Sequence, residues 1–314
     1  MPQHPFGAAA VLGTGLMGPG IALSLAIGGL ETVIVSRTAA AAAAGRQKAL
    51  DQLAVLAANG LVEAGDAPAV EARISSSDDF AASVAAADIV VEAGPETMDF
   101  KHAVYRRLEA AARPDAVLAT TTSGLSINEI AAVCEHPERI ITAHYWNPPH
   151  LMRLVELVRA EATSDKTVAD MRALLEACGK RAVLVKKDRP GQLGNRLQHA
   201  MVREALHIVA EGIADPEDVD LAAKEGFGLR LPVYGIFDHA DAVGLDLVLS
   251  IQDYVNSDLC SSSTAPPSIR ERVERGELGI KTGKGFYDWS QKDWEKVRAK
   301  RDAFISHFLK SEFS

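Results

Sequence analysis

A histidine and a glutamate in the stretch HYWNPPHLMRLVELV, residues 144–158, are the first candidates for chemistry in this chain. His144 ends the apolar run RIITAH, and Glu156 lies inside the apolar segment LVELV. Their separation of 12 residues (156 − 144) is too large for neighbours on one helix, but side chains on adjacent strands could meet. A neutral imidazole can take a proton from an alcohol, and a carboxylate beside it would fix its tautomer and stabilise the imidazolium. Taken alone, a histidine after a strand is more often structural.

A glycine-rich turn near the N-terminus is the second candidate. The stretch VLGTGLMGPG, residues 11–20, follows an apolar strand-like run and opens a helix-like stretch. The G-x-G-x-x-G spacing allows a tight turn and close backbone approach to a pyrophosphate, which the unpaired N–H groups of a helix N-terminus attract. In this context the motif predicts a dinucleotide site, and a purely structural turn is the alternative. The residues expected to contact the cofactor here are Gly13, Gly15, Leu16, Met17 and Gly18.

The end of the second predicted strand bears on the choice of dinucleotide. An acidic residue usually occupies this position and binds the ribose hydroxyls of NAD. This chain has Ser36, Arg37 and Thr38 there instead. Two hydroxyls and a guanidinium would hold a 2′-phosphate that a carboxylate would repel, so we predict a preference for NADP(H) over NAD(H). Alternatively, Arg37 stacks on the adenine and NAD still binds.

Strand-like and helix-like segments alternate through the first part of the chain. Short runs typical of strands occur at residues 9–13, 32–36, 88–93, 116–123, 139–144, 153–158 and 181–187. Helix-like stretches lie near residues 16–28, 40–58, 99–112, 126–135 and 165–179. This alternation predicts an α/β fold of the Rossmann type, a doubly wound and mostly parallel sheet with helices on both faces. Residues 40–73 are too many for a simple crossover, so we expect an inserted helical hairpin there.

The pattern changes at KKDRPGQLGNRL, where Pro190 and Gly191 interrupt the chain. Helical patterns dominate after this point, and Asp215 with Pro216 forms a typical helix start. We therefore expect two domains, a nucleotide-binding domain over residues 1–187 and an all-helical second domain over residues 188–314.

Composition narrows the class of protein. The hydrophobic share of 47% and the charged share of 24% are those of a globular protein, and a net charge of −9 argues against nucleic acid as a partner. The three cysteines are far apart, which favours a reducing, intracellular compartment. The N-terminus has no basic region typical of a secretion signal, and no apolar run has the length of a membrane span. We expect a cytoplasmic protein that does not bind a membrane.

In combination, these motifs resemble the L-3-hydroxyacyl-CoA dehydrogenase superfamily, from the glycine-rich turn to GIKTGKGFYDW near the C-terminus. HYWNPP and the downstream LVE keep the spacing of the family's histidine-aromatic-aromatic-Asn-Pro signature. The resemblance implies that His144 is the catalytic base of a nicotinamide-dependent dehydrogenase and that Glu156 orients it. It also implies that Asn147 binds the reacting oxygen or positions the nicotinamide.

Three further segments match the family. TTTSGLS points to Ser123 as a hydrogen-bond partner of the substrate hydroxyl, VEAGPETMDFK to Glu96 and Lys101 as cofactor contacts, and PGQLGNRL to Asn195 at the active site. Each has a structural alternative. Glu96 and Lys101 could form an exposed pair at a helix start, Ser123 could be a turn residue, and Asn195 could cap a helix. We expect no metal site, because no cluster of ligand residues is apparent.

Two departures from the acyl-CoA members concern the substrate. Coenzyme A carries phosphates, yet the hairpin region over residues 39–72 has only Arg46 and Lys48 as cations. In addition, Arg230 occurs in GFGLRLPVYG, where acyl-CoA members have a neutral segment, and it could grip a free carboxylate with two hydrogen bonds. Arg153 is a second candidate for substrate binding. We therefore expect a small 3-hydroxy carboxylate or similar alcohol as the substrate.

Two alternatives stay open. One is a 3-hydroxyacyl-CoA dehydrogenase, such as a 3-hydroxybutyryl-CoA dehydrogenase, that holds its coenzyme A elsewhere. The other is a non-enzymatic cofactor-binding protein, as the lens crystallins of this superfamily illustrate, although that role would not need Ser123, His144, Asn147 and Glu156 together. The resemblance also implies a homodimer formed through the second domain.

Overall fold

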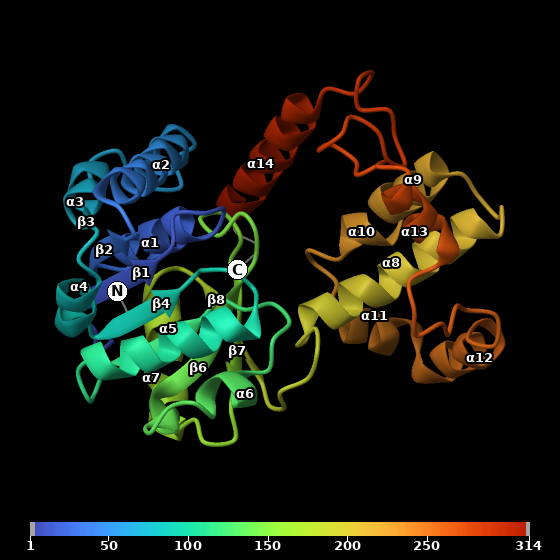
Figure 1. Cartoon of the computed structure of the whole chain (residues 1–314). Coiled ribbons are helices and arrows are strands. Elements are labelled where there is room, and N and C mark those ends of the chain that lie inside the picture. The colour runs from blue at the N-terminus through green and yellow to red at the C-terminus, as the bar shows by residue number, and fades with distance from the viewer. Residues whose placement is uncertain (1–3, 312–314) are drawn as a thin grey trace. The chain divides into compact units, whose positions relative to one another are not determined.

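The computed structural model describes residues 4–311, which form two compact units (Figure 1). The first unit contains residues 4–195 and, from the end of the chain, Phe304–Ser311. The second contains Arg196–Ala303. The predicted division near residue 188 therefore falls a few residues early, and the last turns of the final helix return to the first unit.

The first unit is built on one eight-stranded sheet with the order β3-β2-β1-β4-β5-β6-β7-β8. The strands are β1 (Ala8–Leu12), β2 (Glu31–Val35), β3 (Ile74–Ser77), β4 (Ile89–Glu92), β5 (Val117–Thr120), β6 (Ile140–Tyr145), β7 (Leu154–Arg159) and β8 (Arg181–Val185). The six strands from β3 to β6 are parallel, β7 is antiparallel to β6, and β8 is parallel to β7. The strand order reverses between β1 and β4, which confirms the Rossmann-type arrangement. In sheets of this kind, ligands bind at the switch point.

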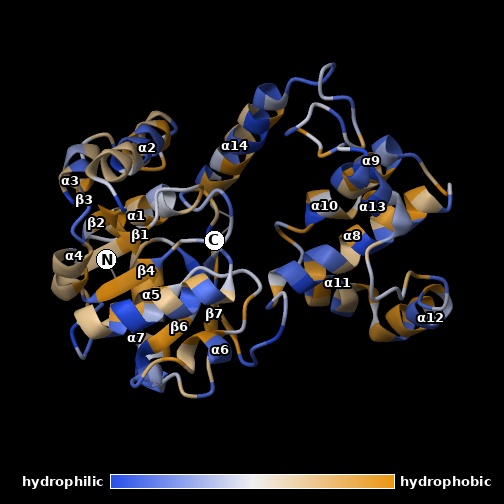
Figure 2. Cartoon of the chain, in the orientation of Figure 1, coloured by the Kyte–Doolittle hydropathy of each residue, from blue (hydrophilic) through white to orange (hydrophobic). Residues whose placement is uncertain are grey.

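Helices cover both faces of this sheet. On one face pack α1 (Gly18–Ile27), α2 (Ala39–Ala58), α3 (Ala67–Ala72) and α7 (Asp165–Ala177). On the other pack α4 (Phe80–Ala86), α5 (Met98–Ala111) and α6 (Ile127–Ala131), and a 3₁₀ turn, η1 (Pro137–Arg139), precedes β6. Figure 2 shows β1, β4 and β6 as hydrophobic strands, as expected of strands that are buried on both faces.

The predicted insertion between the second and third strands of the sheet consists of α2 and α3, a long helix followed by a short one. Thr38 caps α2 by accepting a hydrogen bond from the Ala41 backbone N–H at 3.2 Å. Strand β3 and helix α4 were not anticipated. The sequence of β3, ISSS, is short and polar, and it lies at the sheet edge, where one side of a strand needs no neighbour.

The second unit is helical, as predicted. Its helices are α9 (Pro216–Glu225), α10 (Phe227–Arg230), α11 (Ile236–Val243), α12 (Leu245–Val255) and α13 (Pro267–Glu274). Two longer helices, α8 (Gly194–Ala210) and α14 (Trp294–Lys310), have residues in both units. Within residues 4–311, no helix combines the length and the apolar composition needed to cross a membrane.

Candidate active site

His144 and Glu156 lie directly opposite each other on neighbouring strands. The antiparallel register of β6 and β7 pairs His144 with Glu156, and both residues are buried, with exposed fractions of 7% and 0%. His144 Nδ1 is 3.6 Å from Glu156 Oε1, within ion-pair range and slightly longer than a hydrogen bond. Such contacts often tighten only when the reacting complex forms. The meeting of the two side chains across adjacent strands, which the sequence allowed, is confirmed.

The Glu156 carboxylate is held from several sides. The Trp146 indole Nε1–H donates to Oε1 at 3.0 Å, and the backbone N–H groups of Leu193 and Gly194 donate to Oε2 at 3.0 Å and to Oε1 at 3.2 Å. Burial would raise the pKa of this carboxyl, but His144 and these hydrogen bonds together hold the pKa below its ordinary value. Glu156 is therefore ionised at neutral pH and able to stabilise a charged His144.

Trp146 and Gly194 are site residues to which the sequence analysis assigned no role. A Cβ at Gly194 would lie 2.4 Å from Trp146 Cζ2 and 2.8 Å from Glu156 Oε1, so only glycine fits between the indole and the carboxylate. The Trp146 ring also lies 5.8 Å from the His144 ring, centroid to centroid. The available signal was the aromatic residue two positions after the histidine, whose indole nitrogen can donate a hydrogen bond.

The glycine-rich turn lies at the switch point of the sheet. Gly13 directly follows β1 and has a φ of +117°, and a Cβ there would lie 2.6 Å from the Ala93 carbonyl oxygen. A Cβ at Gly18 would lie 1.9 Å from the Gly13 carbonyl oxygen, so α1 packs directly on the turn. A Cβ at Gly15 would meet no atom within 4 Å, and Leu16 beside it is exposed. Such a turn fits the pyrophosphate of a dinucleotide, which needs close backbone approach at Gly15 and the N-terminus of α1.

The segment after β2 places Ser36, Arg37 and Thr38 at the carboxyl edge of the sheet, with Arg37 and Thr38 exposed. Thr38 also caps α2, so its hydroxyl has a structural partner. The position that an acidic residue would occupy therefore presents a guanidinium.

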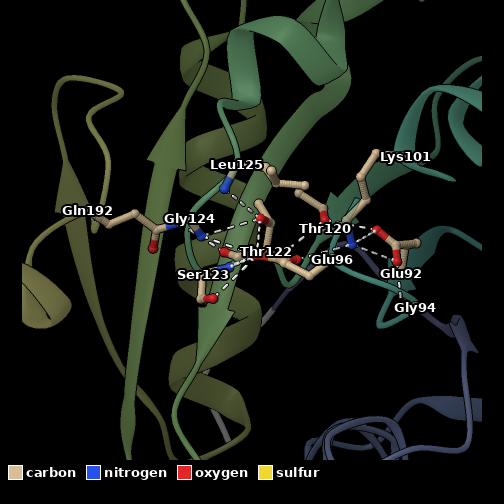
Figure 3. Close-up of polar contacts among 10 residues, drawn as sticks. All are labelled: Glu92, Gly94, Glu96, Lys101, Thr120, Thr122, Ser123, Gly124, Leu125 and Gln192. Atoms are coloured by element: carbon tan, nitrogen blue, oxygen red, sulfur yellow. Dashed lines mark hydrogen bonds and ion pairs between the residues drawn. The ribbon is translucent and has the colours of Figure 1, made fainter. Parts of the chain in front are cut away.

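Ser123 lies in an exposed loop after β5, and hydrogen bonds to Glu96 hold this loop (Figure 3). Glu96 Oε1 accepts hydrogen bonds from the Thr122 hydroxyl at 2.6 Å, the Ser123 N–H at 2.8 Å and the Gly124 N–H at 3.2 Å. Burial would raise the pKa of Glu96, but these hydrogen bonds and the charge of Lys101 hold it below its ordinary value. Lys101, which the resemblance implied as a cofactor contact, has no exposed surface; its ammonium binds Glu92 and lies 3.7 Å from Glu96.

The remaining predicted residues differ in their placement. Asn147 is exposed in the loop after β6, and Asn195 donates a long hydrogen bond of 3.4 Å from Nδ2 to the Ser123 carbonyl. Arg153 is exposed just before β7, at the sheet edge where β6 ends. Arg230 is exposed at the end of α10 in the second unit. Across residues 4–311, no three His, Cys, Asp or Glu side chains are grouped so that they could hold a metal ion.

Lys180 holds the loop that joins β6 and β7. Its buried ammonium donates to the carbonyl oxygens of Pro149 at 2.5 Å and Met152 at 3.0 Å. The pKa of Lys180 is lowered from 10.5 to about 8, chiefly by burial; Cys178 opposes this shift, and the positive charge of Arg153 contributes to it.

This lowered pKa predicts a pH-dependent stability. Between about pH 8 and pH 10.5 the unfolded chain keeps the Lys180 proton that the folded chain has lost, so stability should rise with pH in that window. Below pH 8 both states carry the proton, and the cost of burying the charge is fully present. Between pH 7 and pH 9, the free energy of unfolding should rise by about 1 kcal/mol relative to that of Lys180→Met. Urea titrations of both proteins at the two pH values test this, and parallel curves would contradict it.

Family models match both parts of the chain. The model described as "3-hydroxyacyl-CoA dehydrogenase, NAD binding domain" matches residues 8–189, and "3-hydroxyacyl-CoA dehydrogenase, C-terminal domain" matches residues 191–289. The chain belongs to the 3-hydroxyacyl-CoA dehydrogenase family. The resemblance inferred from the motifs is confirmed, and so is the assignment of the chain to this superfamily of oxidoreductases.

Relatives in the 3-hydroxyacyl-CoA dehydrogenase family cover nearly the whole chain. A 5-formyl-3-hydroxy-2-methylpyridine 4-carboxylate 5-dehydrogenase of Mesorhizobium japonicum is 34% identical over 93% of this chain and 94% of its own. A probable 3-hydroxybutyryl-CoA dehydrogenase of Bacillus subtilis is 40% identical over 90% of this chain and 97% of its own. A crystal structure of a 5-dehydrogenase acting on that pyridine carboxylate, described as an NAD⁺-dependent dismutase, superposes with a TM-score of 0.89 at 33% identity. It covers 96% of this chain and 97% of its own.

Proposed function

We propose that this chain is an NAD(P)-dependent dehydrogenase that reversibly oxidises the 3-hydroxy group of a small carboxylate or similar alcohol, with His144 as general base. The observation that carries the proposal is the pairing of buried His144 and Glu156 across β6 and β7, at the carboxyl edge of a dinucleotide-binding sheet. A merely structural histidine would not require an ionised glutamate held by three hydrogen bonds beside it.

The roles of the chain's own residues follow from this pairing. Because His144 Nδ1 faces Glu156, Nε2 is the nitrogen that takes the hydroxyl proton during oxidation and returns it during reduction. Glu156 stabilises the imidazolium, and Ser123 donates to or accepts from the substrate hydroxyl. Asn147 and Asn195 position the reacting group. The cofactor, when bound along Gly13, Gly15 and the N-terminus of α1, supplies the two-electron redox chemistry.

NADP(H) is the cofactor we favour, although the matching family model is described as an NAD binding domain and a solved relative as an NAD⁺-dependent enzyme. The support is local to the end of β2, where the exposed Arg37 stands between Ser36 and Thr38 and no carboxylate is present to repel a 2′-phosphate.

A small carboxylate is the substrate class we favour over a coenzyme A thioester. The two cations of the α2–α3 region are already engaged. Arg46 Nε donates to the Ile74 carbonyl at 2.6 Å and the guanidinium lies 4.0 Å from Glu71, while Lys48 Nζ donates to the Thr14 carbonyl at 3.3 Å. Arg230, in contrast, is exposed, and one relative is named for a pyridine carboxylate. The relatives named as 3-hydroxybutyryl-CoA dehydrogenases keep the thioester as the second candidate.

The decisive experiment is a panel of 3-hydroxy acids and their coenzyme A thioesters, assayed with NAD⁺ and NADP⁺. We expect the wild-type chain to turn over a free acid, and to do so faster with NADP⁺ than with NAD⁺. In Arg230→Met, the KM for that acid should be at least tenfold higher, which corresponds to a loss of roughly 1.4 kcal/mol of binding free energy. A preference for thioesters with unchanged kinetics in Arg230→Met would establish the second candidate. The absence of any turnover would favour a non-enzymatic cofactor-binding protein.

A homodimer formed through the second unit completes the proposal. None of the helices α9–α13 has a buried residue, and α11 and α12 carry Phe237 and Tyr254 with exposed fractions of 84% and 83%. Apolar surface of this kind is typical of an interface, here with a second copy of the chain. A monomeric mass in sedimentation equilibrium would contradict it.

The three cysteines are free thiols, which supports the expected cytoplasmic location.

A further inference from the structure

A buried ion pair lies on the far side of Glu96 from Ser123 (Figure 3). Glu92 is the last residue of β4 and Lys101 lies in the first turn of α5, and neither side chain has any exposed surface. Lys101 Nζ donates to both oxygens of Glu92, at 2.9 and 2.8 Å. The Thr120 hydroxyl and the Gly94 N–H complete the carboxylate's partners at 2.9 and 2.5 Å. Burying two charges is costly even when every partner is present, so the pair needs a reason beyond stability.

The pair is connected to the exposed loop through one further carboxylate. Lys101 Nζ lies 3.7 Å from Glu96 Oε2, and the Glu96 side chain is 44% exposed. Its other oxygen, Oε1, accepts from Thr122, from the N–H and hydroxyl of Ser123, and from the Gly124 N–H. Glu96 Oε1 therefore directs its hydrogen bonds to the neighbouring loop after β5, while Oε2 faces Lys101.

Other contacts fix the loop at different atoms. Gln192 Nε2 donates to the Thr122 carbonyl at 2.9 Å, and the Thr122 hydroxyl accepts from the Leu125 N–H at 3.0 Å. Glu96 is distinct because it holds both the backbone and the hydroxyl of Ser123, the latter at 3.3 Å. The direction of the Ser123 hydroxyl therefore depends on where Glu96 lies, and the position of Glu96 depends on Lys101.

We propose that Glu92 and Lys101 are positioning residues which, through Glu96, set the orientation of the Ser123 hydroxyl for the reaction. This inference rests on the proposed function, in which Ser123 bonds the substrate hydroxyl. The Lys101 ammonium contacts two carboxylates. Its charge is neutralised by the buried Glu92, and it also attracts the partly exposed Glu96. Because the buried pair is rigid and fully hydrogen bonded, it fixes an otherwise exposed glutamate at little further entropic cost.

The test uses a neutral replacement of the pair, Glu92→Gln with Lys101→Met, so that no unpaired charge is left buried. We expect amide exchange at Ser123 and Gly124, measured by mass spectrometry on the full chain, to become at least tenfold faster. We also expect kcat to fall at least tenfold while KM changes less than threefold. In a Ser123→Ala background the same replacement should change kcat less than threefold, because the residue being positioned is gone.

Leu108→Ala is the matched control, since Leu108 is buried on the same helix α5 and its truncation destabilises the domain without removing any of the hydrogen bonds that hold the loop. It should leave the exchange of the two amides and the kcat unchanged. Unchanged exchange in the neutral replacement, or an equal loss of kcat with and without Ser123, would overturn the proposal and leave the pair a purely stabilising feature. If the wild-type chain turns over no substrate, the proposed function fails, and the exchange result still decides whether the pair positions the loop.

Discussion

Replacing His144 with glutamine should lower kcat/KM for the alcohol substrate by about 10³-fold or more, the range over which general acid–base catalysis contributes. Glutamine keeps a polar group of similar reach beside Glu156 but cannot accept and return a proton near neutral pH. The loss should appear in kcat, because His144 contributes to proton transfer in the transition state more than to ground-state binding. Steady-state kinetics in both reaction directions measure it.

The binding of dinucleotide provides the control for this variant. The glycine-rich turn follows β1 whereas His144 lies on β6, so the dissociation constant of NADPH or NADH in His144→Gln should stay within about threefold of wild type. A variant that retains more than a tenth of the wild-type kcat would refute the assignment of His144 as the base.

Replacing Gly18 with alanine should remove both stability and cofactor binding. The added Cβ would lie 1.9 Å from the Gly13 carbonyl oxygen, a backbone atom that cannot move aside as a flexible side chain could. Either α1 or the turn after β1 must shift, at a cost of roughly 3 kcal/mol in the free energy of unfolding. The displaced helix N-terminus should weaken dinucleotide binding by about 100-fold. Urea unfolding and fluorescence titration with NADPH and NADH measure the two effects.

Gly15→Ala is the matched variant, because a Cβ there meets no atom within 4 Å. It should keep the wild-type stability within about 0.5 kcal/mol and lose cofactor affinity alone. Equal stability of Gly18→Ala and the wild type would contradict the close packing of α1 on the turn, and full affinity in Gly15→Ala would contradict the predicted approach of the pyrophosphate.

Much of the first unit could be predicted because its strands are apolar on both faces and its helices are rich in alanine and leucine. The edge strand β3 could not, since ISSS carries one apolar residue and no alternation. Helix α4 is only seven residues long, and its start at Asp79, whose carboxylate accepts from the Ala82 N–H at 2.9 Å, follows a polar segment without any helical periodicity.

The candidate site likewise contains residues that the sequence could predict and residues that it could not. His144 and Glu156 could be predicted because a family signature marks them, and the register of β6 and β7 brings them together. The supporting residues could not, because their roles depend on contacts distant in sequence. Lys180 holds a loop 28 and 31 residues earlier in the chain, and Glu92 appears in the sequence only as the end of an apolar strand. Likewise, Lys101 was expected to contact the cofactor, and its complete burial became visible only in the fold.

The backbone amides of Leu193 and Gly194 have a practical consequence for chimeric enzymes. They grip Glu156 at the point where α8 begins and leads the chain into the second unit. A junction placed at Pro190 would bring in foreign residues there, and any side chain at position 194 would collide with Trp146 and Glu156. Recombinants that exchange the second unit between relatives should therefore be spliced downstream of Gly194, so that the Glu156 carboxylate keeps its hydrogen bonds to the Leu193 and Gly194 amides.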